Sequence, residues 1–355
     1  MRICIVTVYD SINSGSYWQA FALGKIIKDL GHEVYYYKRN RKGASSSVIV
    51  QAKRIAGLVK KKKIQSAVEY IKKIKIFRIH SRDFCILDKR AYSKVDFFVL
   101  GSDTIWNMDE PYFVENRKVF WGDIFKGKPV LSYAGSIANT CMRELERDSF
   151  YSNCINTWKA ISVRDIHTYT ALKRLTDKQI MIACDPTLLL RKEDYLEMIN
   201  DYIHENYIFM YLFEPLTRVQ DNEILGFAKA HGLKIIGGTG RSISRVCDRY
   251  VVNSPYIFLQ HMLCAKYVIT DTYHGTAFSL NFNKNLVVID RNKTKVKELL
   301  EAYRMLHRLI GHEKSISAVL SDNPDYYNIN MVLDKLRNES LKYLRHAISK
   351  SSEEV

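Results

Sequence analysis

The sequence predicts an α/β fold of two doubly wound, Rossmann-like domains that face each other across a cleft. Three observations support this fold class. Apolar runs of strand length alternate with helical patterns along most of the chain, which is typical of parallel sheets. Most of these runs end in a polar or glycine-containing turn. With 355 residues, the chain also exceeds the size that one hydrophobic core usually serves.

Six strands and a long first helix are expected in an N-terminal domain of residues 1–195. The helix should span Ser16 to Leu30, because Gly31 then supplies a stop signal. A basic helical insertion is expected at about residues 45–90. The expected strands are Arg2–Val8, Val34–Tyr37, Phe97–Leu100, Val130–Tyr133, Ala160–Val163 and Ile180–Ala183.

The alternation continues in a C-terminal domain of residues 196–325, after a boundary near Leu190–Asn206. Residues 326–355 form a charged helical tail that we expect to pack back on the first domain. The expected strands of the second domain are Tyr207–Phe213, Lys234–Ile236, Tyr267–Thr270 and Leu286–Ile289. The expected helices between them are Asp221–His231, Pro255–Ala265 and Gly275–Asn283.

The composition argues against several classes of protein. No run of about 18 apolar residues is present, so no transmembrane helix is expected. The apolar start Met1–Val8 is short and lacks a cleavage site, which favours a first strand over a signal peptide. Seven scattered cysteines without a CxxC pair indicate free thiols in a reducing cytosol. We therefore expect a cytoplasmic protein that binds no metal.

The net charge of +16 is concentrated between Lys53 and Lys75, where nine Lys or Arg residues stand against the single acid Glu69. Interleaved apolar residues follow helical spacing: Ile64, Ala67, Val68, Ile71 and Ile74. This pattern predicts a basic amphipathic helix that can contact the anionic inner face of the plasma membrane, each cation contributing about 1 kcal/mol. A solvated helix face would give the same pattern. Nucleic acid is the competing partner, but no recognisable nucleic-acid-binding motif is present, so we expect none to bind.

Four polar loops should converge on the cleft, because ligands bind at the carboxyl ends of strands in an open α/β sheet. These loops are Asn13–Gln19, Gly101–Asn107, Ser162–Asp165 and Asp271–Gly275. In the last loop, Asp271 and His274 stand between an apolar strand and a helix start, where free N–H groups attract anions. His274 could there meet an anion or move a proton, although a histidine that only caps the loop fits the same pattern.

Two residues of these loops have a specific physical rationale. Arg164 ends an apolar strand, where a guanidinium is costly unless it meets an anion or a carboxylate such as Asp165 or Asp185. Gly15 permits close approach to the backbone at the start of the first helix.

Other motifs of known chemistry are weak or missing. The turn Gly237–Gly240 resembles a phosphate-binding loop, but it has neither GxGxxG nor Walker spacing. The absence of HExxH, DxD and nucleophile-elbow motifs argues against a protease, a metal-dependent sugar transferase and a hydrolase.

Taken together and in this order, the loops resemble the polysaccharide pyruvyl transferase family. Asn13–Leu23 is similar to that family's Asn-x-Gly-x-x-x-Gln-Ala-x-Ala-Leu opening, and Gly101–Asn107 to its Gly-Ser-Asp-x-x-Trp-Asn signature. The other matching segments are Ser132–Ser136, Ser162–Asp165, Asp185–Leu189, Ser254–Leu259 and Thr270–Thr276. The resemblance spans roughly residues 1–310 and leaves out only the basic insertion and the tail.

The resemblance implies a glycosyltransferase-B-like fold and a cyclic pyruvate ketal formed on a sugar of a surface polysaccharide, such as an exopolysaccharide or capsule, or of its precursor. Phosphoenolpyruvate would be the co-substrate, without a resident cofactor, and the acceptor sugar would be lipid- or nucleotide-linked. Arg164 and His274 match positions associated with the family's phosphoenolpyruvate site. Thr272 stands where some members carry an arginine, and Arg241 and Arg308 are the candidates to replace that cation.

We therefore expect Arg164 to clamp the donor and His274 to act as general acid or phosphate ligand. A carboxylate, Asp103 or Asp271, should stabilise positive charge at C2 or take a hydroxyl proton. Alanine at Arg164 or His274 should lower activity about a hundredfold or more and leave the fold intact. The expected donor-binding residues are Asn13, Gly15, Arg164, His274, Gly275 and Thr276, and the expected acceptor-binding residues are Gln19, Asp103 and Trp106.

Two other functions fit the same sequence. One is a nucleotide-sugar-dependent glycosyltransferase of the same architecture, because fold does not fix function. Turnover of a nucleotide sugar without phosphoenolpyruvate would select it. The other is a non-catalytic protein that binds through Lys53–Lys75, and salt-sensitive binding to anionic lipid or nucleic acid would select that one.

Overall fold

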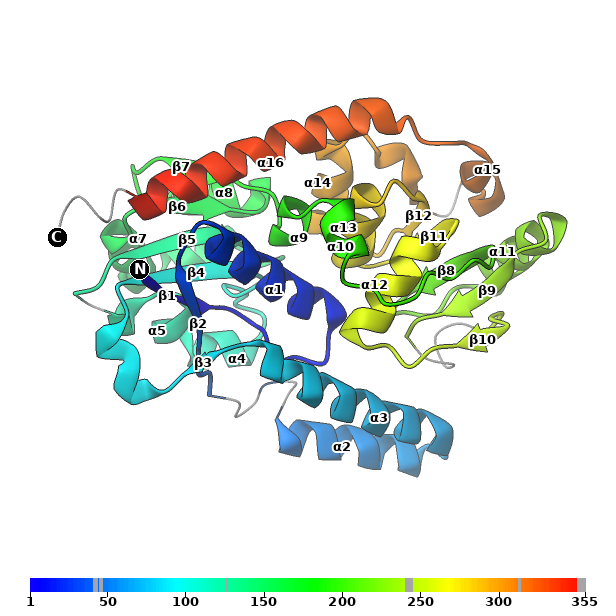
Figure 1. Ribbon diagram of the computed structural model, residues 1–355, viewed down its shortest axis with the longest axis horizontal. Helices are drawn as coiled ribbons and strands as arrows, with labels where there is room; N and C mark the ends of the chain where they lie inside the picture. The colour runs from blue at the N-terminus through cyan, green and yellow to red at the C-terminus, as the bar shows by residue number, and fades with distance from the viewer. Residues whose placement is uncertain (41–43, 45–46, 126, 240–244, 312–313, 350–355) are drawn as a thin grey trace.

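The chain forms two α/β domains, each built on a fully parallel sheet (Figure 1). The computed structural model describes residues 1–40, 44, 47–125, 127–239, 245–311 and 314–349. Within these residues a seven-stranded sheet is followed by a six-stranded sheet. The predicted fold class, two doubly wound domains that face each other, is confirmed.

The first sheet has the strand order β3-β2-β1-β4-β5-β6-β7. Its strands are β1 (Arg2–Val6), β2 (Glu33–Tyr37), β3 (Ile86–Leu87), β4 (Phe97–Asp103), β5 (Val130–Gly135), β6 (Ile161–Val163) and β7 (Ile180–Ile182). The chain adds strands on one side of β1 and then returns to add β4 on the other. The connections diverge at this switch point and leave a crevice beyond the carboxyl ends of β1 and β4.

The second sheet repeats this arrangement in the order β10-β9-β8-β11-β12-β13. Its strands are β8 (Tyr207–Tyr211), β9 (Lys234–Gly237), β10 (Arg249–Tyr250), β11 (Tyr267–Thr270), β12 (Asn285–Ile289) and β13 (Leu309–Ile310). Its switch point lies between β8 and β11. All predicted strands are present, with ends that differ by at most three residues, whereas the two-residue strands β3, β10 and β13 were not predicted.

Helices cover both sheets (Figure 1). The first, α1 (Ser14–Asp29), begins before the predicted position because Asn13 caps it, its side chain accepting a hydrogen bond from the Gly15 N–H at 2.9 Å. The other helices of the first sheet's domain are α4 (Pro111–Glu115), α5 (Arg117–Phe120), α6 (Met142–Glu146), α7 (Ser149–Thr157) and α8 (Ile166–Lys173). Those that follow are α9 (Pro186–Leu189), α10 (Lys192–Leu196), α11 (Arg218–Ala230), α12 (Pro255–Cys264), α13 (Tyr273–Asn281), α14 (Thr294–Ala302) and α15 (Ile316–Ser321).

The basic insertion is a helical hairpin, so the single helix predicted over Lys53–Lys75 is wrong. Two helices, α2 (Val48–Lys60) and α3 (Ile64–His80), lie side by side beneath α1 in Figure 1. The turn between them is Lys61–Lys63, where Lys62 adopts a φ of +56° and ends the helical run. Among the described residues, no helix is both long enough and apolar enough to cross a membrane.

The tail helix α16 (Tyr326–Ser349) lies along both domains (Figure 1). It contacts α13, and its Tyr343 hydroxyl donates to the Ser132 carbonyl of β5 at 2.8 Å. A shared core joins the domains beneath it. The fully buried Trp18 of α1 donates its indole N–H to the Pro255 carbonyl of α12 at 2.9 Å. The two walls of the cleft are therefore held by one continuous apolar interior.

Candidate functional site

A cavity of about 440 Å³ lies where the switch points of the two sheets face each other. Each of the four predicted loops contributes to its lining. Asn13, Asp103 and Arg164 come from the first domain, and His274 comes from the second. Loops separated by up to about 260 positions in sequence thus meet, as the carboxyl ends of parallel strands require.

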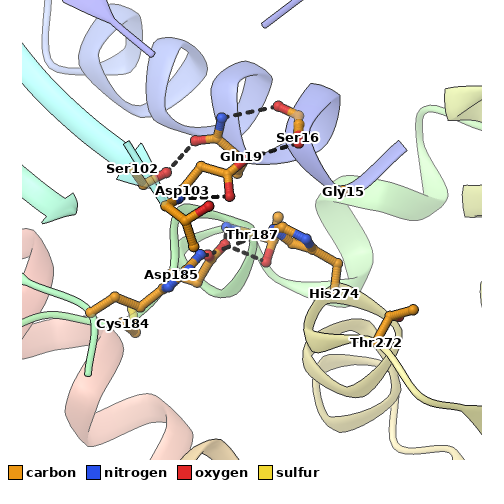
Figure 2. Close-up of polar contacts among 12 residues, drawn as sticks. Gly15, Ser16, Gln19, Ser102, Asp103, Cys184, Asp185, Thr187, Thr272 and His274 are labelled. Carbon is orange, nitrogen blue, oxygen red and sulfur yellow. Dashed lines mark hydrogen bonds and ion pairs between the residues drawn. The ribbon is translucent and has the colours of Figure 1, made fainter. Parts of the chain in front are cut away.

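Asp103 ends β4 with its carboxylate fixed between two donors. Its backbone adopts a φ of +71°, a left-handed conformation that aspartate tolerates better than most residues. Oδ2 accepts a hydrogen bond from Ser16 Oγ at 2.8 Å (Figure 2), and Oδ1 accepts one from the Thr104 N–H, also at 2.8 Å. Burial tends to raise the pKa of Asp103, but His274 in its protonated form, the charges of Arg164 and Lys295 and the Ser16 hydrogen bond lower it overall. The side chain is therefore an ionised carboxylate at neutral pH.

His274 lies in the first turn of α13 and packs directly against α1. Thr272 caps this helix, its hydroxyl accepting from the Gly275 N–H at 3.0 Å. A Cβ added to Gly15 would lie 2.2 Å from His274 Nδ1, so only glycine leaves room for the imidazole (Figure 2). The close approach predicted at Gly15 is thus made by a side chain of the other domain.

Arg164 and His274 share one carboxylate, that of Asp185. Arg164 Nη1 donates to Asp185 Oδ2 at 2.9 Å, and His274 Nε2 lies 3.8 Å from the same oxygen. The other Asp185 oxygen accepts from the Thr187 N–H and hydroxyl (Figure 2). Of the two partners considered for Arg164, Asp185 forms the ion pair. Asp185 itself was not predicted as a site residue, although its Asp-Pro-Thr segment was recognised.

Two of the predicted catalytic residues that line the cavity have a buried polar atom without a hydrogen-bond partner among the described residues. These atoms are Nε of Arg164 and Nε2 of His274. The guanidinium of Arg164 also stacks on the Tyr273 ring, 4.3 Å from its centroid, which fixes its plane. Buried polar atoms normally find partners, so these two are suited to bind a ligand.

The electrostatic environment keeps His274 neutral at pH 7. Burial lowers its pKa, as do the charges of Arg164 and Lys295, and the opposing effects of Asp185 and Asp103 do not compensate. An anion bound beside the imidazole would favour its protonated form and raise this pKa. Protonation of His274 is therefore coupled to the binding of an anion.

Lysines at the start of α14 complete the cavity, and the sequence analysis missed them. Lys293 and Lys295 line it from the second domain. Burial and the neighbouring Arg164 lower the pKa of Lys295 to about 8. Cations at a helix N-terminus oppose the helix dipole, so this placement is unfavourable unless an anion is bound there. The only sequence signal was the position of the lysines just after β12.

Of the three predicted acceptor-binding residues, Asp103 lines the cavity, whereas Gln19 and Trp106 do not. Gln19 is fully buried, and its side-chain amide donates to Thr7 Oγ1 and to two backbone carbonyls (Figure 2). It also accepts from Ser102 Oγ and so ties α1 to the end of β4. Trp106 is also fully buried and stacks on Trp158 with centroids 5.5 Å apart. Both residues lie behind the cavity wall, because their polar atoms form hydrogen bonds inside the first domain.

Three further predicted residues also act from behind the cavity surface. The Asp271 carboxylate accepts the backbone N–H groups of Phe213 and Glu214 at 2.8 and 3.0 Å, which joins the loops after β8 and β11. Gly275 fits against Thr270 and Thr272 within α13. The Thr276 hydroxyl donates to the Thr272 carbonyl at 2.9 Å. None of these three residues lines the cavity, so its lining does not support their predicted contact with substrate.

Of the two proposed replacements for the missing arginine, Arg308 does not line the cavity. The guanidinium of Arg308 is fully buried and donates to the carbonyls of Val319 and Asp322 at 2.7 and 2.8 Å. Arg241 and the last residue of the predicted phosphate turn, Gly240, lie outside the described residues. Gly237 and Gly238 pack against the rings of Tyr250 and Phe209.

The fold is similar to that of several solved proteins, two of which are bound to a UDP-sugar. UDP-GlcNAc 2-epimerase from Neisseria meningitidis, bound to UDP-GlcNAc, is 10% identical with a TM-score of 0.50, covering 99% of this chain and 100% of that chain. The glycotransferase of kitacinnamycin is 11% identical with a TM-score of 0.50 and coverages of 99% and 98%. Arabidopsis thaliana UGT89C1 complexed with UDP-L-rhamnose is 10% identical with a TM-score of 0.50 and coverages of 97% and 98%. At these identities the likeness establishes the two-Rossmann-domain fold alone.

Sequence comparison identifies the family. No curated protein matches the chain. The family model described as polysaccharide pyruvyl transferase, however, matches residues 13–293, which include all four cavity loops. The match extends from the cap of α1 to the first lysine before α14. The chain belongs to the polysaccharide pyruvyl transferase family.

Proposed function

We propose that this protein transfers the pyruvyl group of phosphoenolpyruvate to two hydroxyls of a polysaccharide-precursor sugar and so forms a cyclic ketal. One observation carries the proposal. The cavity sets cationic side chains from both domains, Arg164 and Lys295, beside the carboxylate of Asp103. Family membership supplies the class of reaction, and this charge arrangement suits a small donor that carries two anionic groups.

The cationic end of the cavity would hold the donor. Phosphoenolpyruvate carries a carboxylate and a phosphate, and Arg164 offers an unused Nε–H beside a fixed guanidinium plane. Lys295 and the free N–H groups at the start of α14 suit the second anionic group. Lys295, from a different element, would then provide the cation that some family members carry at the position of Thr272.

The reaction needs two protons to move. A proton adds to C3 of the donor, converting the vinyl carbon to a methyl group, while the first sugar hydroxyl attacks C2 and loses its proton. The C2–O bond to phosphate then breaks with its electron pair on phosphate, the second hydroxyl attacks C2 and closes the ring, and the proton of that hydroxyl leaves with the phosphate. His274, which lines the cavity, would donate the first proton once the donor's anionic groups have raised its pKa. Asp103, an ionised carboxylate in the cavity lining, would accept a hydroxyl proton.

The first-domain end of the cavity would hold the acceptor sugar. Thr104, Asn107 and Glu110 line it with hydroxyl, amide and carboxylate groups, and Tyr112 and Phe113 add aromatic surface. Such a mixture suits the hydroxyl groups and apolar ring faces of a sugar. The guanidinium of Arg39 is already paired with Asp10 and the Tyr112 hydroxyl, so it forms a wall of this region.

A nucleotide-sugar-dependent glycosyltransferase remains the second candidate, because similar folds bind UDP-sugars in the solved structures. Release of inorganic phosphate separates the two functions. We expect phosphate release only when phosphoenolpyruvate and a suitable lipid- or nucleotide-linked sugar are both present, with the product gaining a pyruvate ketal by mass spectrometry. Consumption of a nucleotide sugar without phosphoenolpyruvate would instead identify a glycosyltransferase.

A further inference from the structure

The outward face of α3 combines aliphatic and cationic side chains. Ile64, Val68, Ile71 and Ile79 recur at helical spacing and are between 36% and 58% exposed. They form one stripe on the helix, whereas Ala67 and Phe77 form its buried face. The exposed stripe is therefore not the core of the hairpin, and none of its four residues belongs to a hydrophobic cluster of the described residues.

Cations surround this aliphatic stripe. Lys72, Lys75 and Arg78 are exposed on the same face of α3, and Lys61–Lys63 form the turn that precedes it. The one acid of the hairpin, Glu69, lies to the side of the stripe by helical geometry. Aliphatic side chains bordered by lysines are the pattern of a helix that lies in the interfacial plane of an anionic bilayer.

The partner helix α2 has the same character. Val48, Ile49 and Val59 are exposed, and Lys53 and Lys60 accompany them. Single exposed aliphatic residues are common, but seven of them on two adjoining helices are unusual for helices that contact water alone.

The base of this hairpin adjoins the cleft. The His80 ring at the end of α3 lies 4.8 Å from the Tyr256 ring of α12. The loop after β1 serves both regions: Ser11 and Asn13 line the main cavity, while Asp10 and Ile12 line a second cavity of about 340 Å³ against α2 and α3. A substrate group in the main cavity is therefore one loop away from the hairpin.

We propose that the α2–α3 hairpin docks the protein on a bilayer containing anionic phospholipid. The cations match the lipid head groups, and the aliphatic stripe enters the acyl boundary, which a nucleic-acid backbone does not offer. Docking itself is independent of the proposed ketal reaction. The consequence that it brings the cleft to a lipid-linked sugar rests on that reaction.

Flotation of the full chain with vesicles tests the docking. One variant combines Ile64→Asn, Val68→Asn and Ile71→Asn, and a second combines Lys72→Gln and Lys75→Gln. The control is Val219→Asn with Leu225→Asn, two exposed aliphatic residues of α11 outside the hairpin. Vesicles of phosphatidylcholine are compared with vesicles of phosphatidylcholine and phosphatidylglycerol, at low and high salt.

The wild type and the control should float with the phosphatidylglycerol vesicles and not with phosphatidylcholine alone. The lysine variant should bind these vesicles about 30-fold more weakly, and salt should weaken the wild type. The aliphatic variant should also detach, while the thermal shift produced by phosphoenolpyruvate stays unchanged in both variants. Absence of flotation, equal flotation of the hairpin variants, or binding to RNA alone would overturn the proposal whatever the cleft catalyses.

Discussion

Asp185 links the two side chains on which the proposed donor site depends. It accepts from Arg164 at 2.9 Å and lies 3.8 Å from His274, and its side chain is fully buried. Arg164→Ala would therefore leave a buried carboxylate without its cation, at a cost of about 3–5 kcal/mol. This variant should therefore lose stability as well as activity, because the ion pair is also structural. Lys295, which is only partly buried, is the cleaner residue to test.

Gly15→Ala should reduce turnover about a hundredfold, because the new Cβ would occupy the space of the His274 ring and displace it. Gly226→Ala is the matched control, since this helical glycine has no atom within 4 Å of an added Cβ. The control should keep its activity and gain about 0.5–1 kcal/mol of stability in urea unfolding. Full activity in the Gly15 variant would show that the position of His274 is unimportant.

The affinity for phosphoenolpyruvate should depend on pH through Lys295. Its pKa of about 8 means that the charged form is complete well below pH 8 and is lost as the pH rises through that value. An anionic donor binds the charged form, so affinity should fall by up to about tenfold per pH unit above pH 8. Titration calorimetry across this range measures the effect. Lys295→Arg keeps its charge and should flatten the profile, whereas an identical fall in that variant would assign the effect to another group.

Sequence patterns identified the loops of the site but not the direction of each side chain. Lys295 stands among Lys293 and Lys297 in a run that looks like a solvated helix start, and only the fold turns it toward Arg164. The reverse holds for Gln19 and Trp106, which were predicted to bind substrate but do not line the cavity. They belong to recognisable motifs, yet packing directs them into the first domain.

At the scale of elements, α13 determines where His274 points. Thr272 caps this helix, so the residue that replaces the arginine of some family members has a structural role of its own. Thr272→Ala should cost about 1 kcal/mol of stability, because the Gly275 N–H loses its partner. Urea unfolding measures this loss. Thr272→Ser should restore most of the stability. An unchanged urea midpoint for the alanine variant would show that the Thr272 cap does not stabilise α13.

Elements with a strong local signal were predictable, and edge elements were not. The buried strands β1, β4 and β11 can be recognised in the sequence as apolar runs that end in polar loops. The break at Lys61–Lys63 has neither glycine nor proline, so the helical pattern of the sequence continues across it without a stop signal. Strands β3, β10 and β13 are two residues long, too short for a periodicity to register.

At the scale of the whole molecule, the site exists because two similar sheets present their switch points to each other. Asp103 and Arg164 come from one sheet, and His274 and Lys295 from elements of the other. The shared core around Trp18 and the tail helix α16 hold these halves together. Local sequence patterns could not predict the strand order or the direction of each side chain. The alternation of strands and helices was enough to predict two domains with a cleft.

The most direct test of the central claim is thermal unfolding with and without phosphoenolpyruvate, for the wild type, Lys295→Met and Lys297→Met. At a hundred times its dissociation constant the donor should stabilise the wild type by about 2.7 kcal/mol, a shift of several degrees. Lys297 is exposed on the same helix, so its variant should keep this shift, and Lys295→Met should lose most of it. No shift with phosphoenolpyruvate in the wild type, together with a shift by UDP-GlcNAc, would contradict the account and favour a glycosyltransferase.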